Sequence, residues 1–244
     1  MVTIQKGSLS SQTGPMFKKT SHVHLRPASE LLSRRFFLLF LILLGTLLFY
    51  PYAETYGFLY VAFRVLGSVA VLVSVYAVTL KRGLLLVALV LAIPALVQRN
   101  LLPRPDQGIL SILNIAFSFL FDAFIIVVII RRVFRHEKPN SETIFGALCV
   151  YLLIGFTFGS IYEILAIEPR TFYLDPVVNT HSVPDRFDVL FYSFTSMTGL
   201  GAAGMVAISP QARSLTITES IIGVLFLAVL VARLLGSYRS DSAQ

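Results

Sequence analysis

Residues 187–236 decide the fold and read FDVLFYSFTSMTGLGAAGMVAISPQARSLTITESIIGVLFLAVLVARLLG. Residues 188–197 form a short amphipathic segment, which as a helix is too short to cross a bilayer. A glycine-rich turn follows at 198–204, and residues 214–236 are long and apolar enough for a span. With the apolar segment before it, the order is long helix, short helix, loop, long helix. Irregular backbone at membrane depth is tolerated only where protein or water surrounds it, as in a pore lined by several copies of a chain.

The composition is that of a polytopic membrane protein. The chain has 244 residues, of which 56% are hydrophobic and 14% are charged. The net charge of +7 comes from Lys and Arg that gather in alternate loops. This distribution is an orientation signal and not a nucleic-acid-binding patch. No catalytic constellation or nucleotide-binding loop is present in the sequence, so we expect neither an enzyme nor a resident cofactor.

Six spans are predicted from the apolar segments: 36–52, 58–80, 83–102, 109–130, 143–167 and 214–236. The basic loops place both termini in the cytoplasm, and His181 on the outer side, of a bacterial-type plasma membrane. The expected fold is an all-α membrane protein of six transmembrane helices. A re-entrant pore helix and a filter loop lie between helices five and six.

Four parts follow from this arrangement. Residues 1–35 are a cytoplasmic basic tail, and residues 238–244 are a short cytoplasmic tail. Residues 36–133 are a four-helix membrane accessory domain, and residues 140–237 are the pore domain. The span at 109–130 contains no Lys or Arg, so the accessory domain lacks the repeated cations of a voltage sensor.

Residues 141–236 resemble the pore domain of the potassium-channel family. The likeness is close in SFTSMTGLG, in SPQARSLTITESIIG and in LAVLVARLLG. It implies a homotetramer in the lipid bilayer that conducts a monovalent cation passively, with potassium as the expected ion. Its implied partners are further copies of the chain and lipid, with no nucleic acid.

The filter departs from this family. The family reads Thr-Thr-Leu-Gly-Tyr-Gly-Asp, and the matching residues here are Thr198, Gly199, Leu200, Gly201, Ala202, Ala203 and Gly204. Gly199 removes a hydroxyl ligand, Ala202 removes an aromatic brace and Ala203 replaces a permissive glycine. Gly204 removes the acid at the outer mouth. We therefore expect a slack loop with weakened potassium selectivity.

Three residues outside the filter are expected to support it. The resemblance places Glu163 and Phe194 behind the filter in bracing roles, with Glu163 supporting either the pore helix or the filter backbone, although Glu163 at an interface also suits simple exposure. Gly223 falls at the position of the gating hinge, and close packing against the fifth span is an equal alternative. Arg64, Asp122 and Glu163 are the ionisable residues that we identify inside the spans.

Other functions fit the same pattern. GLGAAG also suits a tight re-entrant turn, in which case the protein is a non-conducting membrane scaffold or regulatory subunit with a channel fold. A small-solute transporter is less well matched, because matching inverted halves with broken helices are not evident.

Overall fold

The computed structural model is mostly helical and describes residues 35–55, 57–78, 82–101, 109–135, 141–179, 181–201 and 204–241. The helices are α2 (Arg35–Thr55), α3 (Gly57–Val78), α4 (Arg82–Leu101), α5 (Ile109–Arg135), α6 (Ser141–Leu165), α7 (Arg186–Thr198) and α8 (Pro210–Asp241). The strands are β1 (Phe172–Leu174) and β2 (Met205–Ala207).

Three helices have the length and the apolar composition that a membrane span requires. Arg35–Tyr52, Thr143–Leu165 and Pro210–Arg233 are long and apolar enough to cross a membrane. Shorter apolar helical segments are found at Val65–Tyr76 and Leu85–Pro94. Each predicted span overlaps one helix over most of its length, but the number of spans and the re-entrant position of α7 stay predictions.

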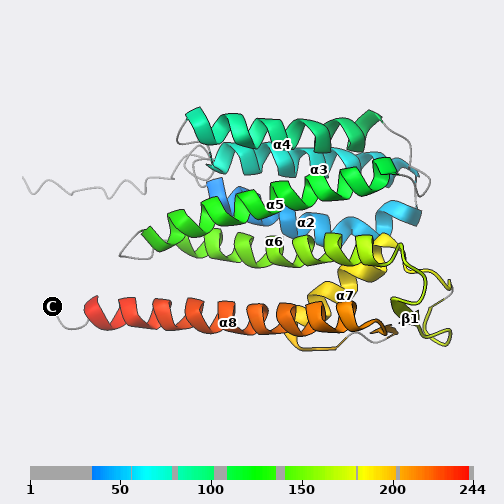
Figure 1. Cartoon of the computed structure of the whole chain (residues 1–244). Helices are drawn as coiled ribbons and strands as arrows, with labels where there is room; N and C mark the ends of the chain where they lie inside the picture. The colour runs from blue at the N-terminus through cyan, green and yellow to red at the C-terminus, as the bar shows by residue number, and fades with distance from the viewer. Residues whose placement is uncertain are drawn as a thin grey trace, which may run out of the picture.

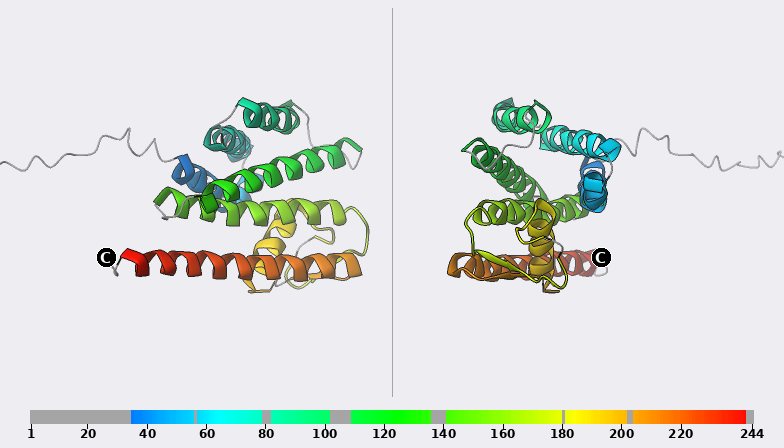
Figure 2. Two further views of the ribbon diagram at one scale, coloured as in Figure 1. Left: turned by 60° about the vertical axis from the view of Figure 1, so that its left-hand side comes forward. Right: turned by 90° about the vertical axis from the view of Figure 1, so that its right-hand side faces the viewer.

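α6 occupies the middle of the molecule. α2 and α5 pack on one side of it, with α3 and α4 further out (Figure 1). α7 and α8 lie on the other side, and α7 bridges α6 and α8 at a steep angle to both (Figure 2). The main core forms between α2, α5 and α6, where Leu39, Ile125, Ile129 and Val150 are buried. Ile125 and Ile129 are four residues apart, so they share one face of α5.

The ends of the bundle differ in chemistry. At one end the Arg35 guanidinium lies over the Tyr76 ring, 4.5 Å from its centroid, and Arg132 lies over Phe36 at 5.1 Å. These contacts join the start of α2 to the ends of α3 and α5, and α8 also ends there (Figure 1). The two strands lie at the opposite end.

A small antiparallel sheet corrects the all-α prediction. Phe172 pairs with Ala207 and Leu174 pairs with Met205. The Ile208 N–H also donates to the Thr171 carbonyl at 2.9 Å. Each strand has only three residues, which is too short for an alternation pattern to stand out in the sequence. The sheet ties the chain that follows the glycine turn to the chain that follows α6.

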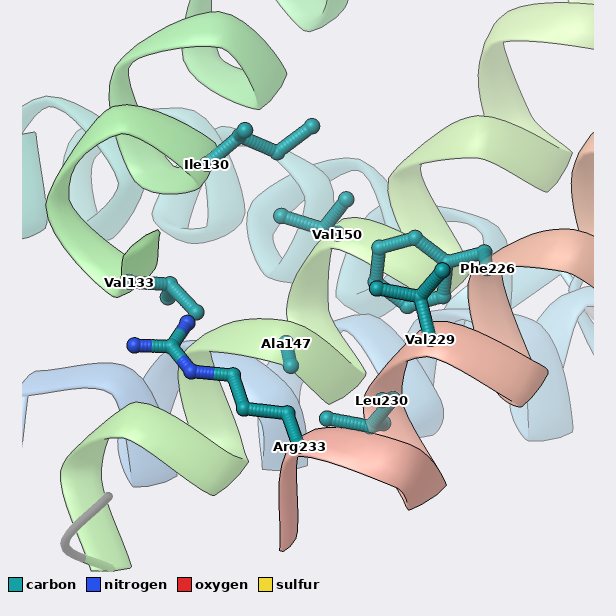
Figure 3. Close-up of a pocket in the computed structure, with 8 residues that line it drawn as sticks. All are labelled: Ile130, Val133, Ala147, Val150, Phe226, Val229, Leu230 and Arg233. Carbon is teal, nitrogen blue, oxygen red and sulfur yellow. The ribbon is translucent and has the colours of Figure 1, made fainter. Parts of the chain in front are cut away.

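The far half of α8 contacts the bundle through few side chains. Figure 3 shows Phe226 and Leu230 of α8 facing Val150 and Ala147 of α6, with Arg233 reaching across toward α5. A cavity of about 20 Å³ separates these side chains. Among the described residues of α8, the buried ones are Ala212, Glu219 and Gly223, in the half of the helix that meets α7.

Impermeant labelling tests which end of the bundle faces outward. A cysteine in place of Val177, which is 90% exposed between α6 and α7, is expected to react with an impermeant maleimide on intact cells. A cysteine in place of Ser237, near the end of α8, is expected to react only after permeabilisation. The wild-type protein is the background control, because its one cysteine, Cys149, is buried. Reaction of both introduced cysteines before permeabilisation would contradict the predicted orientation.

Candidate functional site

The start of α7 is fixed by charged and polar contacts. Asp185 caps the helix by accepting from the Asp188 N–H at 2.8 Å, and Asp188 Oδ2 accepts from the Asp185 N–H at 2.9 Å. His181 Nε2 lies 2.6 Å from the same Asp188 oxygen. Arg186 Nε donates to Glu163 Oε1 at 3.0 Å. Glu163 therefore contacts the start of α7, and in one copy of the chain this is at the opposite end of α7 from the glycine turn.

Three glycines let α7 approach its neighbours closely. A β-carbon on Gly155 of α6 would lie 2.6 Å from the Phe194 ring, and one on Gly159 would lie 3.1 Å from the Leu190 side chain. On α8, a β-carbon on Gly223 would lie 2.4 Å from the Met197 carbonyl oxygen. Separations below 3.0 Å cannot be accommodated without a shift of the neighbour. At each of these glycines, atoms of α7 occupy the space where the β-carbon of another residue would lie.

Phe194 and Gly223 can now be placed. The Phe194 ring sits on Gly155 and meets the Phe156 ring edge to face, with centroids 5.6 Å apart. Gly223 packs against the end of α7 at Met197. The alternative to a hinge predicts packing against the fifth span instead. The predicted packing partner, the fifth span, is therefore wrong, and the observed partner is α7. Close contact with α7 accounts for a glycine at this position without a hinge.

A buried polar cluster joins α6, α7 and α8. Glu219 of α8 is 0% exposed. Its Oε2 accepts from the Tyr162 hydroxyl at 2.7 Å, and its Oε1 is hydrogen-bonded to the Ser193 hydroxyl. Glu219 is not among the residues predicted from the sequence, although an acid inside the predicted span at 214–236 is a signal of a functional or paired residue.

Further polar contacts surround this cluster. The hydroxyls of Tyr192 and Thr216 lie 2.7 Å apart. The Ser220 hydroxyl donates to the Ser196 carbonyl at 2.9 Å. α7 is thus joined to α8 by hydrogen bonds along its second half, as well as by the contact at Gly223.

The first part of the glycine turn folds back on α7. Gly199 and Gly201 both have φ of 76°, in the left-handed region that glycine adopts without a Cβ penalty. The Gly199 N–H donates to the Ser196 carbonyl and the Gly201 N–H donates to the Thr195 carbonyl, both at 3.2 Å. These bonds satisfy carbonyls that a helix end leaves without partners. Leu200, between the two glycines, is 81% exposed.

The last part of the turn is held by the chain that follows β1. The Gly204 carbonyl accepts from the Asp175 N–H at 2.9 Å and from Asn179 Nδ2 at 2.7 Å. Gly204 has φ of 92°, and a β-carbon there would lie 3.1 Å from Asn179 and from Val178. An aspartate at this position, as in the potassium-channel pattern, would therefore be strained. Both ends of the turn are anchored, in contrast to the slack loop that we expected.

Two filter residues, Ala202 and Ala203, lie outside the described residues. Thr198 lies on the exposed side of α7, where its hydroxyl donates to the Phe194 carbonyl at 2.8 Å. Its oxygen keeps lone pairs that could face a cation. The structure thus brings Thr198, Gly199, Leu200, Gly201 and Gly204 into one turn. It places Phe194 and Gly223 against α7's neighbours and Glu163 at α7's other end.

An open cavity of about 570 Å³ borders the turn. It lies between the end of α7, strand β2 and the start of α8, and is lined in part by Ser196, Thr216 and Ser220. Arg213 also lines it and donates to the Ala207 carbonyl at 3.1 Å. The lining offers hydroxyl and backbone groups, with no paired acid and base among the residues that the structure describes.

Known protein families, characterised proteins and solved structures yield no match to this chain. The function must therefore be inferred from the residues of the site.

Substitution of Gly223 tests the packing of α7 on α8. Gly223→Ala is expected to destabilise the protein by about 1–3 kcal/mol, because the added carbon collides with backbone at Met197. Thermal unfolding in detergent or nanodiscs measures this. Gly83→Ala is the matched control, since a β-carbon there meets nothing within 4 Å. A Gly223→Ala protein as stable as wild type, with altered gating only, would contradict close packing and favour a hinge.

Proposed function

We propose that the chain is one subunit of a homotetrameric, potassium-channel-like pore that passes monovalent cations passively across a bacterial-type plasma membrane. In this proposal α6 and α8 cross the membrane, α7 is the re-entrant pore helix and residues 198–204 line the ion path. One observation carries it: a short helix is held between two span-length helices and ends in an exposed glycine turn.

The length of α7 supports a re-entrant position. A helix of 13 residues is about 20 Å long at about 1.5 Å per residue, which falls short of the hydrocarbon core of about 30 Å. The chain must then turn at membrane depth, where lipid cannot satisfy backbone groups. In one copy, Thr198, Gly199, Leu200 and Gly201 are all exposed on the same turn. Further copies around a water-filled axis would provide the surroundings that this backbone needs.

The surface of α8 supports the same assembly. Only a narrow strip, including Glu219 and Gly223, is buried within one copy. Large apolar side chains remain exposed along the rest of the helix: Ile217, Ile221, Val224, Leu225, Val229, Val231 and Leu235. Neighbouring copies and lipid together would cover these side chains.

Six spans with both termini in the cytoplasm fit the arrangement of the helices. The basic contacts of Arg35 and Arg132 lie at the end of the bundle where α8 also ends. Cytoplasmic ends of membrane helices are the ones enriched in Lys and Arg. The glycine turn, which follows α7 toward the middle of the membrane, would then open to the outer side.

Weak ion selectivity follows from the geometry of the turn. Discrimination between potassium and sodium needs several carbonyls held around the ion. The N–H groups of Gly199 and Gly201 bond back to α7, so the chain curls at this point instead of extending along an axis. The side chain that the family has at Gly199 is β-branched, and at φ of 76° it would be strongly disfavoured. A potassium-type filter would require this part of the turn to be rebuilt.

A non-conducting scaffold is the second candidate, and Leu200 favours it. Its apolar side chain is 81% exposed within one copy. If four copies converged at this point, a ring of leucines would obstruct the path by excluding water. Such a protein would keep the channel architecture and serve as a membrane scaffold or regulatory subunit.

Ion flux in proteoliposomes tests the proposal. The purified protein is expected to support potassium and sodium fluxes of similar size, because the curled turn does not line up several carbonyls along one axis. A cysteine in place of Leu200 is expected to make the flux sensitive to a charged thiol reagent. A cysteine in place of Val177 is the control, because it lies in the segment between α6 and α7 and outside the turn. Strong potassium preference would overturn the weak-selectivity claim, and an assembled protein without flux would favour the scaffold.

A further inference from the structure

Four oxygen-bearing groups form one buried chain across three helices. The Tyr162 hydroxyl of α6 lies 2.7 Å from Glu219 Oε2. Glu219 Oε1 is hydrogen-bonded to the Ser193 hydroxyl of α7. The Ser193 oxygen in turn lies 2.8 Å from the Gly155 carbonyl of α6. All four residues are buried, and Tyr162, Ser193 and Glu219 are 0% exposed.

Hydrogen counting restricts the protonation state of this chain. A hydroxyl has one hydrogen to donate, and a carbonyl can only accept. Suppose that Ser193 donates its hydrogen to an ionised Glu219. The Ser193 oxygen and the Gly155 carbonyl oxygen would then be in contact with no hydrogen between them. If Ser193 donates to Gly155, Glu219 must itself carry a hydrogen and donate to Ser193. The second arrangement places one hydrogen in each of the three contacts.

The surroundings of Glu219 agree with a neutral acid. Tyr162 faces it from α6 and Ser193 faces it from α7, and the neutral Tyr151 of α6 is close enough to interact with it. On α8 itself, Thr216 is engaged with Tyr192. Within the described part of the chain, no Lys, Arg or His is within ion-pair distance of the Glu219 carboxyl group. A buried carboxylate without a cation is costly, whereas a neutral carboxylic acid with both oxygens hydrogen-bonded is not.

We propose that Glu219 is a neutral carboxylic acid whose hydrogen bonds to Ser193 and Tyr162 set the position of α7 between α6 and α8. Glu219 and Gly223 are four residues apart on α8, and their contacts Ser193 and Met197 are four residues apart on α7. The two helices therefore meet twice in register, once by hydrogen bond and once by close packing. Since Met197 directly precedes Thr198, this register fixes where the glycine turn begins.

Replacement by glutamine separates a neutral acid from a carboxylate. The amide of Glu219→Gln can donate to Ser193 and accept from Tyr162, as a neutral acid does. We expect this variant to keep the wild-type melting temperature. Glu219→Leu keeps the bulk and loses both hydrogen bonds, and we expect it to lower the melting temperature by roughly 4–8 °C.

Infrared spectroscopy of the protein in lipid at neutral pH reports the protonation state directly. The wild-type spectrum minus that of Glu219→Gln is expected to contain the carbonyl band of a protonated carboxylic acid. Glu168→Gln is the control, because Glu168 is exposed and its replacement should leave the band in place. Absence of the band, or a Glu219→Gln protein as unstable as Glu219→Leu, would overturn the inference.

The proposed pore is required only for the expected effect of Glu219 on ion flux, and not for its role in positioning α7. In the flux assay Glu219→Gln is expected to behave as wild type, and Glu219→Leu to lose flux. Loss of flux in Glu219→Gln with the band assigned and the fold intact would overturn the positioning role. If the wild-type protein showed the band and no flux, the pore proposal would fail while the assignment of Glu219 as a neutral acid would stand.

Discussion

The contact between α7 and the glycines of α6 and α8 is the one on which the rest of the structure depends. On α6, Gly155 contacts Phe194 and Gly159 contacts Leu190. On α8, Gly223 contacts the end of α7 at Met197. A short helix has unsatisfied backbone groups at both ends, and lipid cannot satisfy them. Close packing holds this helix between α6 and α8, and the backbone groups at its ends find polar partners in the adjoining chain. The capping box at Asp185 serves one end and the glycine turn serves the other.

Hydrogen bonds add to this close packing by fixing the register of α7 against its neighbours. Close packing on glycines alone does not fix the register between two helices, because glycine has no side chain to interlock with its neighbour. The hydrogen-bonded chain from Tyr162 through Glu219 to Ser193 has direction and distance requirements that permit one register. Buried polar networks can specify a unique arrangement in this way when every member is satisfied. The cost of burying an acid is offset here only because each of its oxygens has a partner.

Much of the helical layout could be predicted, because apolar segments of span length are unambiguous. The predicted segment at 143–167 corresponds to α6 (Ser141–Leu165), and the one at 214–236 lies inside α8 (Pro210–Asp241). The strands could not be predicted, because three residues are too few to show a period. Glu219 could have been singled out as an acid inside a span. Its partners lie 57 and 26 residues away, a separation that helix periodicity does not connect. The glycines of α6 lie within the predicted span at 143–167, but their pairing with α7 depends on the packed register.

The spacing of the glycine turns in the assembled protein tests the central claim most directly. A spin label on Leu200→Cys, in nanodiscs, lets pulsed electron dipolar spectroscopy measure the distances between copies, since the native Cys149 is buried. A fourfold pore predicts two distances in the ratio of the side of a square to its diagonal. A single distance, as in a dimer, or no dipolar coupling, as in a monomer, would contradict a pore built around α7.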